Sequence, residues 1–318
     1  MYFQLPFLYD FFKIHSARIL FGIFFIMVFI SSVRSQTTKL PNTNQPVNYW
    51  KLDINYLSDY VYMGRKDSLP TPYLTPTLTY YHVSGFYFSG SLSYLSEKKS
   101  RRIDYGSLDI GYSFNLSEQF GGDIYANKSW YNQSSTNVAS DIKGYIGALM
   151  NYDLHLIQVN GGMDLLFSNK PDFTCNLGAS HAFQLGEKEY QITITPSFTA
   201  NWSTLHSYEG YINRRVGKRP GIIVPVNNTI SAITRVENNR LTLMDFELSI
   251  PFNYESPRFG ISFTPSLAIP RNPIYTTTTI ITTTPSGIQN SQTFPSTPAS
   301  ELDLQNRFYA ELSFYIKF

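Results

Sequence analysis

The nearest approach to a catalytic pair in this sequence is a histidine and a serine two residues apart, His82 and Ser84. A serine nucleophile needs a base that is itself oriented by a third group, and no third residue stands at a recognisable spacing. Serine followed by glycine, as in Ser84-Gly85, is typical of a tight turn. We therefore interpret the pair as turn chemistry and expect no enzymatic activity.

Metal-ligating residues are equally sparse. The other histidines are scattered, at His15, His155, His181 and His206, and Cys175 is the single cysteine. A structural zinc site needs about four such ligands at close spacing, and a disulfide needs two cysteines. The sequence therefore predicts neither a metal centre nor a bound cofactor.

Charged residues recur on the polar side of stretches that alternate between polar and apolar residues. Alternate side chains of a β-strand face opposite ways, so these charges would share the inner wall of a barrel, where a mildly acidic surface favours cations. Alternatively, the charges pair across the interior and fill it, since barrels of about eight strands are filled and barrels of about sixteen conduct. The candidates are Lys51, Asp53, Asp59, Asp109, Asp123, Asp164, Asp245, Glu247, Glu311 and Lys317.

A second group of charges lies in a long polar stretch, residues 203–239. Arginine forks match the geometry of phosphate, so this basic cluster would attract anionic solutes or the phosphates of lipopolysaccharide. Loop charges are more often simply solvated, and we favour that interpretation. The cluster consists of Arg214, Arg215, Lys218 and Arg219.

The clearest strand lies at the end of the sequence. Within Phe308–Phe318, apolar or small residues alternate strictly with polar residues or tyrosine, as a sheet requires when one side meets an apolar medium and the other meets water. A terminal aromatic strand resembles the C-terminal signal of bacterial outer-membrane β-barrels. The resemblance implies that Phe318 is an assembly signal for the barrel-assembly machinery.

Twelve candidate strands follow one another, and most approximate the ~10 residues with which a tilted strand crosses a bilayer. The connections after even-numbered strands are short, and most of those after odd-numbered strands are longer, which is typical of barrels with short periplasmic turns and longer extracellular loops. The candidates are Tyr49–Arg65, Pro72–Val83, Phe86–Leu95, Ile103–Phe114, Phe120–Tyr131, Ile142–Tyr152, Leu156–Phe167, Phe173–Phe183, Tyr190–Trp202, Arg240–Tyr254, Phe259–Ile269 and Phe308–Phe318.

The two longest connections predict different structures. Residues 203–239 contain a candidate hairpin, Ile222–Val226 and Thr229–Ile233, that would extend above the membrane or raise the strand number to fourteen. Between Arg271 and Glu301 there is no charge, and Thr, Ser and Pro abound, which predicts a flexible or extended surface loop.

Prolines are the main objection to a barrel. A proline removes one donor from a strand ladder and normally argues against a central strand. Three of them, Pro76, Pro196 and Pro265, share a Thr-Pro context, and we interpret that repeat as bulges or bends on the outward face. Four fall inside candidate strands, Pro76, Pro196, Pro251 and Pro265.

The N-terminus predicts a cleaved signal peptide over residues 1–35. Its apolar run, Ile19–Ile30, is too short to span a bilayer, which takes about 20 residues. Cleavage removes three basic residues and Asp10, so the formal net charge falls from +2 to zero, and no basic surface for nucleic acid is implied. Residues 36–48 would then be a periplasmic N-terminal segment and residues 49–318 the barrel.

Composition supports the same class of protein. Charged residues make up 15% of the chain, below the ~25% of soluble domains. Aromatic residues make up 16%, and membrane barrels carry aromatic girdles at both interfaces. A soluble β-sandwich would leave the alternating connection lengths unexplained.

Two stretches, Leu57–Ser68 and His82–Gly90, are similar to the opening hairpin of TorF-type porins. The matching residues are Ser58-Asp59-Tyr60, Gly64 and Ser84-Gly85-Phe86-Tyr87, while Met63 replaces the arginine usual before the glycine and Arg65 follows it. The similarity implies an outer-membrane barrel that acts as a pore.

Together these patterns predict an all-β protein, an antiparallel up-and-down barrel of twelve strands in a Gram-negative outer membrane. We expect a small porin-like passive channel for small polar solutes or ions. The alternative is a closed structural or adhesive barrel that acts through its extracellular loops. The expected partners are outer-membrane lipid, lipopolysaccharide, the barrel-assembly machinery and small solutes, and not nucleic acid.

Overall fold

The computed structural model describes residues 48–318, except 68, 188–189, 217–228, 237–239 and 299–303. The expected signal peptide and residues 36–47 lie outside the described residues. Within the described part, no helix is long and apolar enough to cross a membrane. The elements are β1 (Tyr49–Leu57), β2 (Tyr73–Tyr81), β3 (Phe86–Leu95), β4 (Arg102–Asn115), β5 (Phe120–Tyr131), β6 (Gly144–Asp153), β7 (Gln158–Phe167), β8 (Asp172–Ser180), β9 (Phe183–Glu187), β10 (Tyr190–Ile194), β11 (Ser197–Ser203), α2 (His206–Val216), β12 (Thr229–Val236), β13 (Thr242–Ser249), β14 (Phe252–Glu255), β15 (Phe259–Pro270), β16 (Tyr275–Thr283), β17 (Gln289–Pro298) and β18 (Arg307–Lys317).

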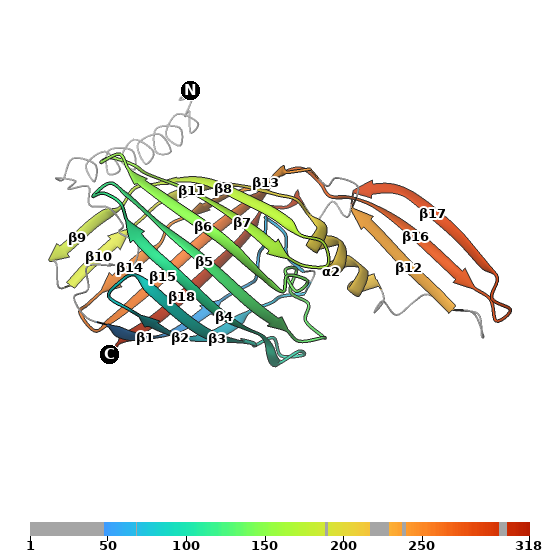
Figure 1. Ribbon diagram of the computed structural model, residues 1–318, viewed down its shortest axis with the longest axis horizontal. Helices are drawn as coiled ribbons and strands as arrows, with labels where there is room; N and C mark the ends of the chain where they lie inside the picture. Colours follow the sequence, from blue (N-terminus) through green and yellow to red (C-terminus); the bar gives the residue numbers. More distant parts are fainter. Residues whose placement is uncertain (1–47, 68, 188–189, 217–228, 237–239, 299–303) are drawn as a thin grey trace, which may run out of the picture.

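A closed antiparallel barrel of twelve strand positions confirms the predicted fold (Figure 1). Strands β1 to β8 pair in sequence order, β11, β13, β15 and β18 follow, and β18 pairs with β1. The seam is completed by reciprocal backbone hydrogen bonds between Trp50 and Phe318, at 2.8 and 2.9 Å. Short turns join the strands at one end, which we call the short-turn end, and longer segments at the other, the long-loop end.

Sequence alternation decides which side chains face outward. In β3, Phe86 and Leu92 are exposed to 56% and 55%, whereas Ser89 and Ser93 on the opposite face are exposed to 9% and 0%. The same alternation recurs around the barrel, so its outside is a belt of apolar side chains. A sheet of this kind has an apolar exterior and a polar interior.

The prolines are accommodated in two ways. Pro76 and Pro265 lie within β2 and β15 on the outward face, each in register with a residue of the neighbouring strand. Pro196 and Pro251 interrupt their strands and separate β10 from β11 and β13 from β14. Their carbonyls still accept backbone hydrogen bonds from His181 and Thr195 at 3.2 and 2.9 Å, so the wall bends there without opening.

The first strand is shorter than predicted. Tyr60 and Tyr62 continue its alternation, but β1 ends at Leu57. Met63 and Gly64 have φ of 50° and 73°, a left-handed conformation outside the extended region of a regular strand. Residues 58–72, which we call the crossing segment, leave the wall instead.

Both long connections also differ from prediction. Residues 229–236 form β12, which pairs with β16, and β16 pairs with β17 in a separate three-stranded sheet. Figure 1 shows this projecting sheet beyond the long-loop end of the barrel. The fourteen-strand alternative is therefore wrong. The charge-free stretch after Arg271, predicted as a flexible or extended surface loop, contains the hairpin β16–β17. Residues Ile222–Val226 of the expected hairpin lie outside the described residues.

Candidate functional site

The strand register places nine of the charged candidates on the inner face of the barrel. Each lies opposite polar, small or inward-facing residues of the adjoining strands: Asp53 is in register with Thr77, and Asp164 with Gly147 and Thr174. These inward residues are Lys51, Asp53, Asp109, Asp123, Asp164, Asp245, Glu247, Glu311 and Lys317.

Four of the inner-wall carboxylates receive their hydrogen bonds from neutral donors. Asp109 accepts from Ser107 Oγ at 3.1 Å, from Ser89 Oγ at 3.4 Å and from Asn127 Nδ2 at 2.5 Å. Glu311 accepts from the side-chain amide of Asn55. The remaining two, Asp123 and Asp164, accept from tyrosine, serine and threonine. Such hydrogen bonds hold a carboxylate in place without neutralising its charge.

Tyrosine side chains lie along this wall and do not point to the barrel axis. Tyr87 on β3 donates its hydroxyl to Asp123 Oδ1 on β5 at 3.0 Å, so its ring passes over β4. The residue beneath the ring is Gly111, where a Cβ would stand 2.4 Å from the phenol. Glycine is required there because the ring occupies the place of its side chain.

Two ion pairs lie at the short-turn end. Lys51 Nζ lies 3.1 Å from Asp53 and Lys317 Nζ lies 2.7 Å from Glu255. The two lysines are direct register partners on β1 and β18. Lys51 also stands 4.4 Å from the ring centre of Tyr315. The two lysines at this end are thus paired with carboxylates, whereas no ion pair among the described residues joins a lysine or arginine to Asp109, Asp123 or Asp164.

The crossing segment is held across the interior by Arg65. The guanidinium, only 2% exposed, donates to the carbonyls of Met244 at 2.8 Å, of Arg271 at 2.8 Å and of Asn272 at 2.7 Å. These acceptors belong to β13 and to the chain after β15, whereas the segment connects β1 to β2. A fourth bond, to Met63 O at 2.6 Å, fixes the turn of the segment itself.

The same segment also contacts the opposite wall. Tyr60 and Tyr62 pack against Ala139, Ile142 and Leu166, and Leu166 lies on β7, six positions from β1 in the twelve-strand ring. Both tyrosines lie in the segment after β1, and burial raises the pKa of each phenol. The two buried rings therefore bring the segment, as a layer of side chains, from β1 to the opposite wall of the lumen.

Asp59 belongs to this layer and not to a strand wall. It is 9% exposed, and its Oδ1 accepts from the backbone N–H and the hydroxyl of Thr71, both at 2.9 Å. Lys66 donates to its other oxygen. Asp59 therefore ties the two ends of the crossing segment together.

Helix α2 also contacts the crossing segment. Asp172 accepts from the backbone N–H groups of His206 and Ser207 at 2.7 and 2.6 Å, which caps the first turn of the helix. Tyr211 of α2 then donates to Asp67 of the crossing segment at 2.7 Å. In the predicted basic cluster, Arg214 and Arg215 lie in α2, while Lys218 and Arg219 lie outside the described residues.

The predicted turn chemistry of the histidine–serine pair has a clear geometry. His82 Nδ1 lies 2.8 Å from Ser84 Oγ in the exposed connection between β2 and β3, and Gly85 has a φ of 98°. Among the described residues, no group of three or more His, Cys, Asp or Glu side chains could hold a metal ion.

Comparison with known proteins finds only remote structural similarity. No protein-family model matches the sequence, and no curated protein matches it. Among solved structures, a KdgM porin is 7% identical over 84% of this chain and 99% of its own, with a TM-score of 0.43. OmpF of Salmonella typhi is 8% identical over 85% of this chain and 97% of its own, with a TM-score of 0.29. OccK8 of Pseudomonas aeruginosa is 9% identical over 85% of this chain and 97% of its own, with a TM-score of 0.30. These values are too low to assign a family or a solute.

Proposed function

We propose that this chain is an integral outer-membrane protein of a Gram-negative bacterium and acts as a porin-like passive channel with a preference for small cations. The exterior supports a membrane location, because exposed apolar side chains such as Ile110 and Ile124, at 57% and 55%, surround a closed barrel in which every strand position is paired on both sides. Closed barrels are one of the two backbone architectures that satisfy every polar group inside lipid.

One observation carries the proposed selectivity. Asp109, Asp123 and Asp164 lie together on the β4–β7 wall and are held by hydroxyl and amide donors. Because rings of carboxylates favour cations in pores, this wall would attract cations along one side of the lumen. The crossing segment would then set the narrowest section, so we propose a small conductance.

The test is a planar-bilayer recording of the refolded chain under a salt gradient. We expect discrete conductance steps and a reversal potential of the sign set by cation flow. A well-inserted barrel that shows no steps at any voltage would reject the channel, and a reversal potential at zero or of the opposite sign would reject the cation preference. Heat-modifiable migration on a gel would establish separately that the barrel has folded.

A second function is favoured by the projecting sheet. Strands β12, β16 and β17 combine both long connections into one ordered body that stands beyond the barrel. Exposed side chains such as Phe294 and Ile288, at 42% and 61%, would suit a surface or adhesive role. Deleting residues 275–298 should abolish binding to host or bacterial surfaces if that role is correct, and leave conductance unchanged.

The similarity to TorF-type porins also belongs to this proposal. Of its matching residues, Ser58 to Tyr60 and Gly64 lie in the crossing segment, whereas Ser84 to Tyr87 lie at the turn between β2 and β3. A shared way of narrowing the pore would explain the first group. The basic cluster of Arg214, Arg215, Lys218 and Arg219 is proposed as a group of solvated loop charges, with contact to lipopolysaccharide phosphates as the alternative.

A further inference from the structure

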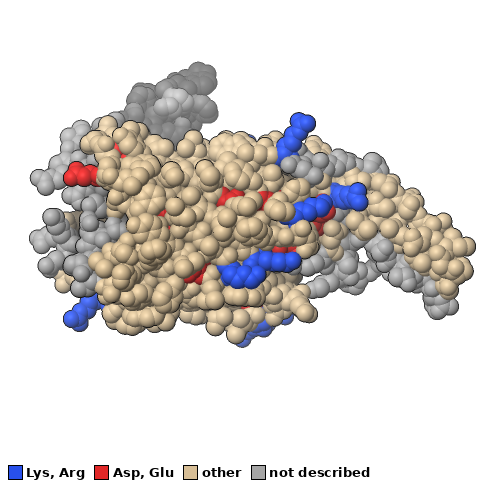
Figure 2. All heavy atoms as spheres, in the orientation of Figure 1, with Lys and Arg blue, Asp and Glu red and all other residues tan. Residues whose placement is uncertain are grey.

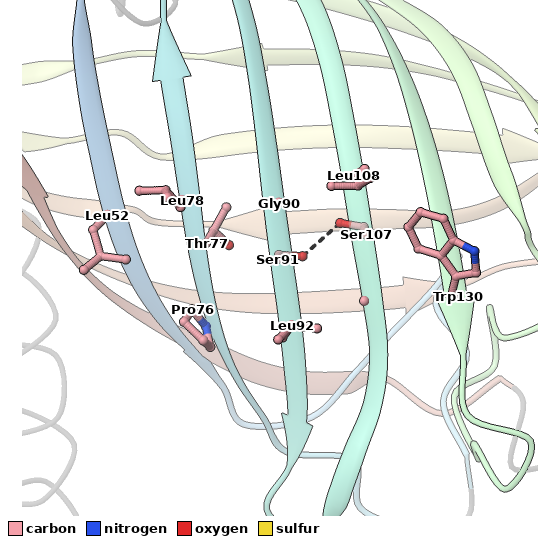
Figure 3. Close-up of a pocket in the computed structure, with 11 residues that line it drawn as sticks. Leu52, Pro76, Thr77, Leu78, Gly90, Ser91, Leu92, Ser107, Leu108 and Trp130 are labelled. Atoms are coloured by element: carbon pink, nitrogen blue, oxygen red, sulfur yellow. Dashed lines mark hydrogen bonds between the residues drawn. The ribbon is translucent and has the colours of Figure 1, made fainter.

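A shallow apolar groove crosses the outward face of β2, β3, β4 and β5. Its volume is about 450 Å³, and Figure 3 shows the side chains that line it. The groove exists because two glycines, Gly90 and Gly106, stand in rows that are otherwise bulky. One row runs Leu78, Gly90, Leu108, and the next runs Leu92, Gly106, Trp130.

Trp130 forms one wall of the groove. It is the register partner of Gly106 on β4 and is 52% exposed. Its place near the end of β5, one residue before Tyr131, puts the indole at the long-loop edge of the apolar belt. Indole rings favour this boundary because one part of the ring is apolar and the N–H needs a polar partner.

A lysine stands at the rim of the same groove. Lys128 is exposed on the outward face of β5 and is the register partner of Leu108, which lines the groove. Its Nζ lies 5.8 Å from the centre of the Trp130 ring. A lysine on the lipid-facing side is costly unless its ammonium reaches the interface or meets an anion.

We propose that this groove binds one acyl chain of a net-negative, phosphate-bearing lipid, with Lys128 on the headgroup phosphate and Trp130 against the chain. The inference rests on the proposed membrane function. The apolar lining suits an acyl chain, and the charge at the rim complements the phosphate. Figure 2 shows that lysine and arginine side chains on the visible face stand mostly toward the long-loop end, so an anionic lipid would be favoured at this edge.

The experiment is quenching of Trp130 fluorescence by lipids brominated on their acyl chains. The refolded full chain carries Trp50→Phe and Trp202→Phe, so that Trp130 is the single tryptophan, and is titrated in nonionic micelles with brominated phosphatidylglycerol or brominated phosphatidylcholine. We expect half-maximal quenching at an about fivefold lower concentration of the anionic lipid, the factor for one lysine near an anionic surface.

Two variants separate the headgroup from the chain. Lys128→Gln should abolish the preference for the anionic lipid, whereas Lys98→Gln, the same charge change in an exposed loop at the same end, should keep it. Gly90→Val should weaken quenching by both lipids, because its side chain would fill the groove, where a Cβ at this position already stands 3.3 Å from Leu108.

Equal quenching by the two lipids, or loss of the preference in both lysine variants, would overturn the proposal. The channel proposal is tested separately. It would be rejected if a barrel that shows heat-modifiable migration on a gel gave no conductance steps in a planar bilayer. A chain that never folds in micelles would refute the membrane barrel and this site together.

Discussion

The hydroxyl of Tyr125 on β5 donates to Oδ1 of Asp164 on β7 at 2.7 Å, across the intervening strand β6. Gly147 lies beneath the contact, and a Cβ there would stand 2.0 Å from the carboxylate and 2.6 Å from the ring. The arrangement repeats the relation of Tyr87, Gly111 and Asp123, which lies two strands earlier in the barrel. In each case a tyrosine bonds an acid two strands away, and its ring lies flat over a glycine on the strand between them.

The first prediction concerns this tie. Gly147→Ala should lower the free energy of unfolding by about 1–3 kcal/mol, because the added methyl overpacks a site with no room for it. Denaturant unfolding of the refolded barrel measures the change. Gly161→Ala is the matched control, since a Cβ at this outward-facing glycine meets its nearest atom at 3.6 Å. Equal stability of the two variants would contradict the tie.

Strand number and strand faces could be predicted because both depend on local alternation. The aromatic and aliphatic residues of Phe308–Phe318 identify their outward side without any knowledge of partners. The inward position of the acids on the strands could be predicted from the same alternation. Their hydrogen-bond partners did not, since Asp164 is tied to Tyr125, 39 positions earlier in the chain.

The crossing segment could not be predicted from alternation. Tyr60 and Tyr62 continue the alternation of β1, but they do not lie in the wall. The segment that contains them is held by backbone carbonyls that accept from Arg65, and these belong to residues 179 to 207 positions later in the chain. The hairpin β16–β17 of the projecting sheet was missed for a related reason. Thr-rich composition suggested a loop, but threonine is β-branched and favours strands when a partner is present.

The second prediction concerns the anchor of the crossing segment. Arg65→Gln should weaken the attachment of residues 58–72 by about 3 kcal/mol, roughly two lost charged hydrogen bonds. We expect larger single-channel steps and faster amide exchange in the segment, with the strands still protected. Arg101→Gln, in an exposed loop at the same end, should change neither. Unchanged step size together with faster exchange would mean that this segment does not limit ion flow.

The third prediction concerns ion selectivity. Replacing Asp109, Asp123 and Asp164 by asparagine should move the cation-to-anion permeability ratio toward unity, because the amides keep the shape and lose the charge. Reversal potentials in a salt gradient measure the ratio. Asp153→Asn, at a short turn where the carboxylate accepts from His155 N–H at 2.7 Å, is the control. A ratio that stays at the wild-type value in the triple variant would show that this wall does not select ions.

The last prediction concerns the seam between β1 and β18. Phe318 exchanges two backbone hydrogen bonds with Trp50, and its ring is 67% exposed on the outward face. Deleting Phe318 should remove both bonds, at about 1 kcal/mol each, and we propose that it also removes the aromatic group that the barrel-assembly machinery recognises. Phe318→Leu separates the two effects, since it keeps the backbone bonds. Slow assembly of both variants in vesicles that contain the machinery, with spontaneous refolding impaired only in the deletion, would support recognition of the ring. If Phe318→Leu assembled at the wild-type rate, the two backbone hydrogen bonds would account for the whole effect of this residue, and recognition of the ring would be rejected.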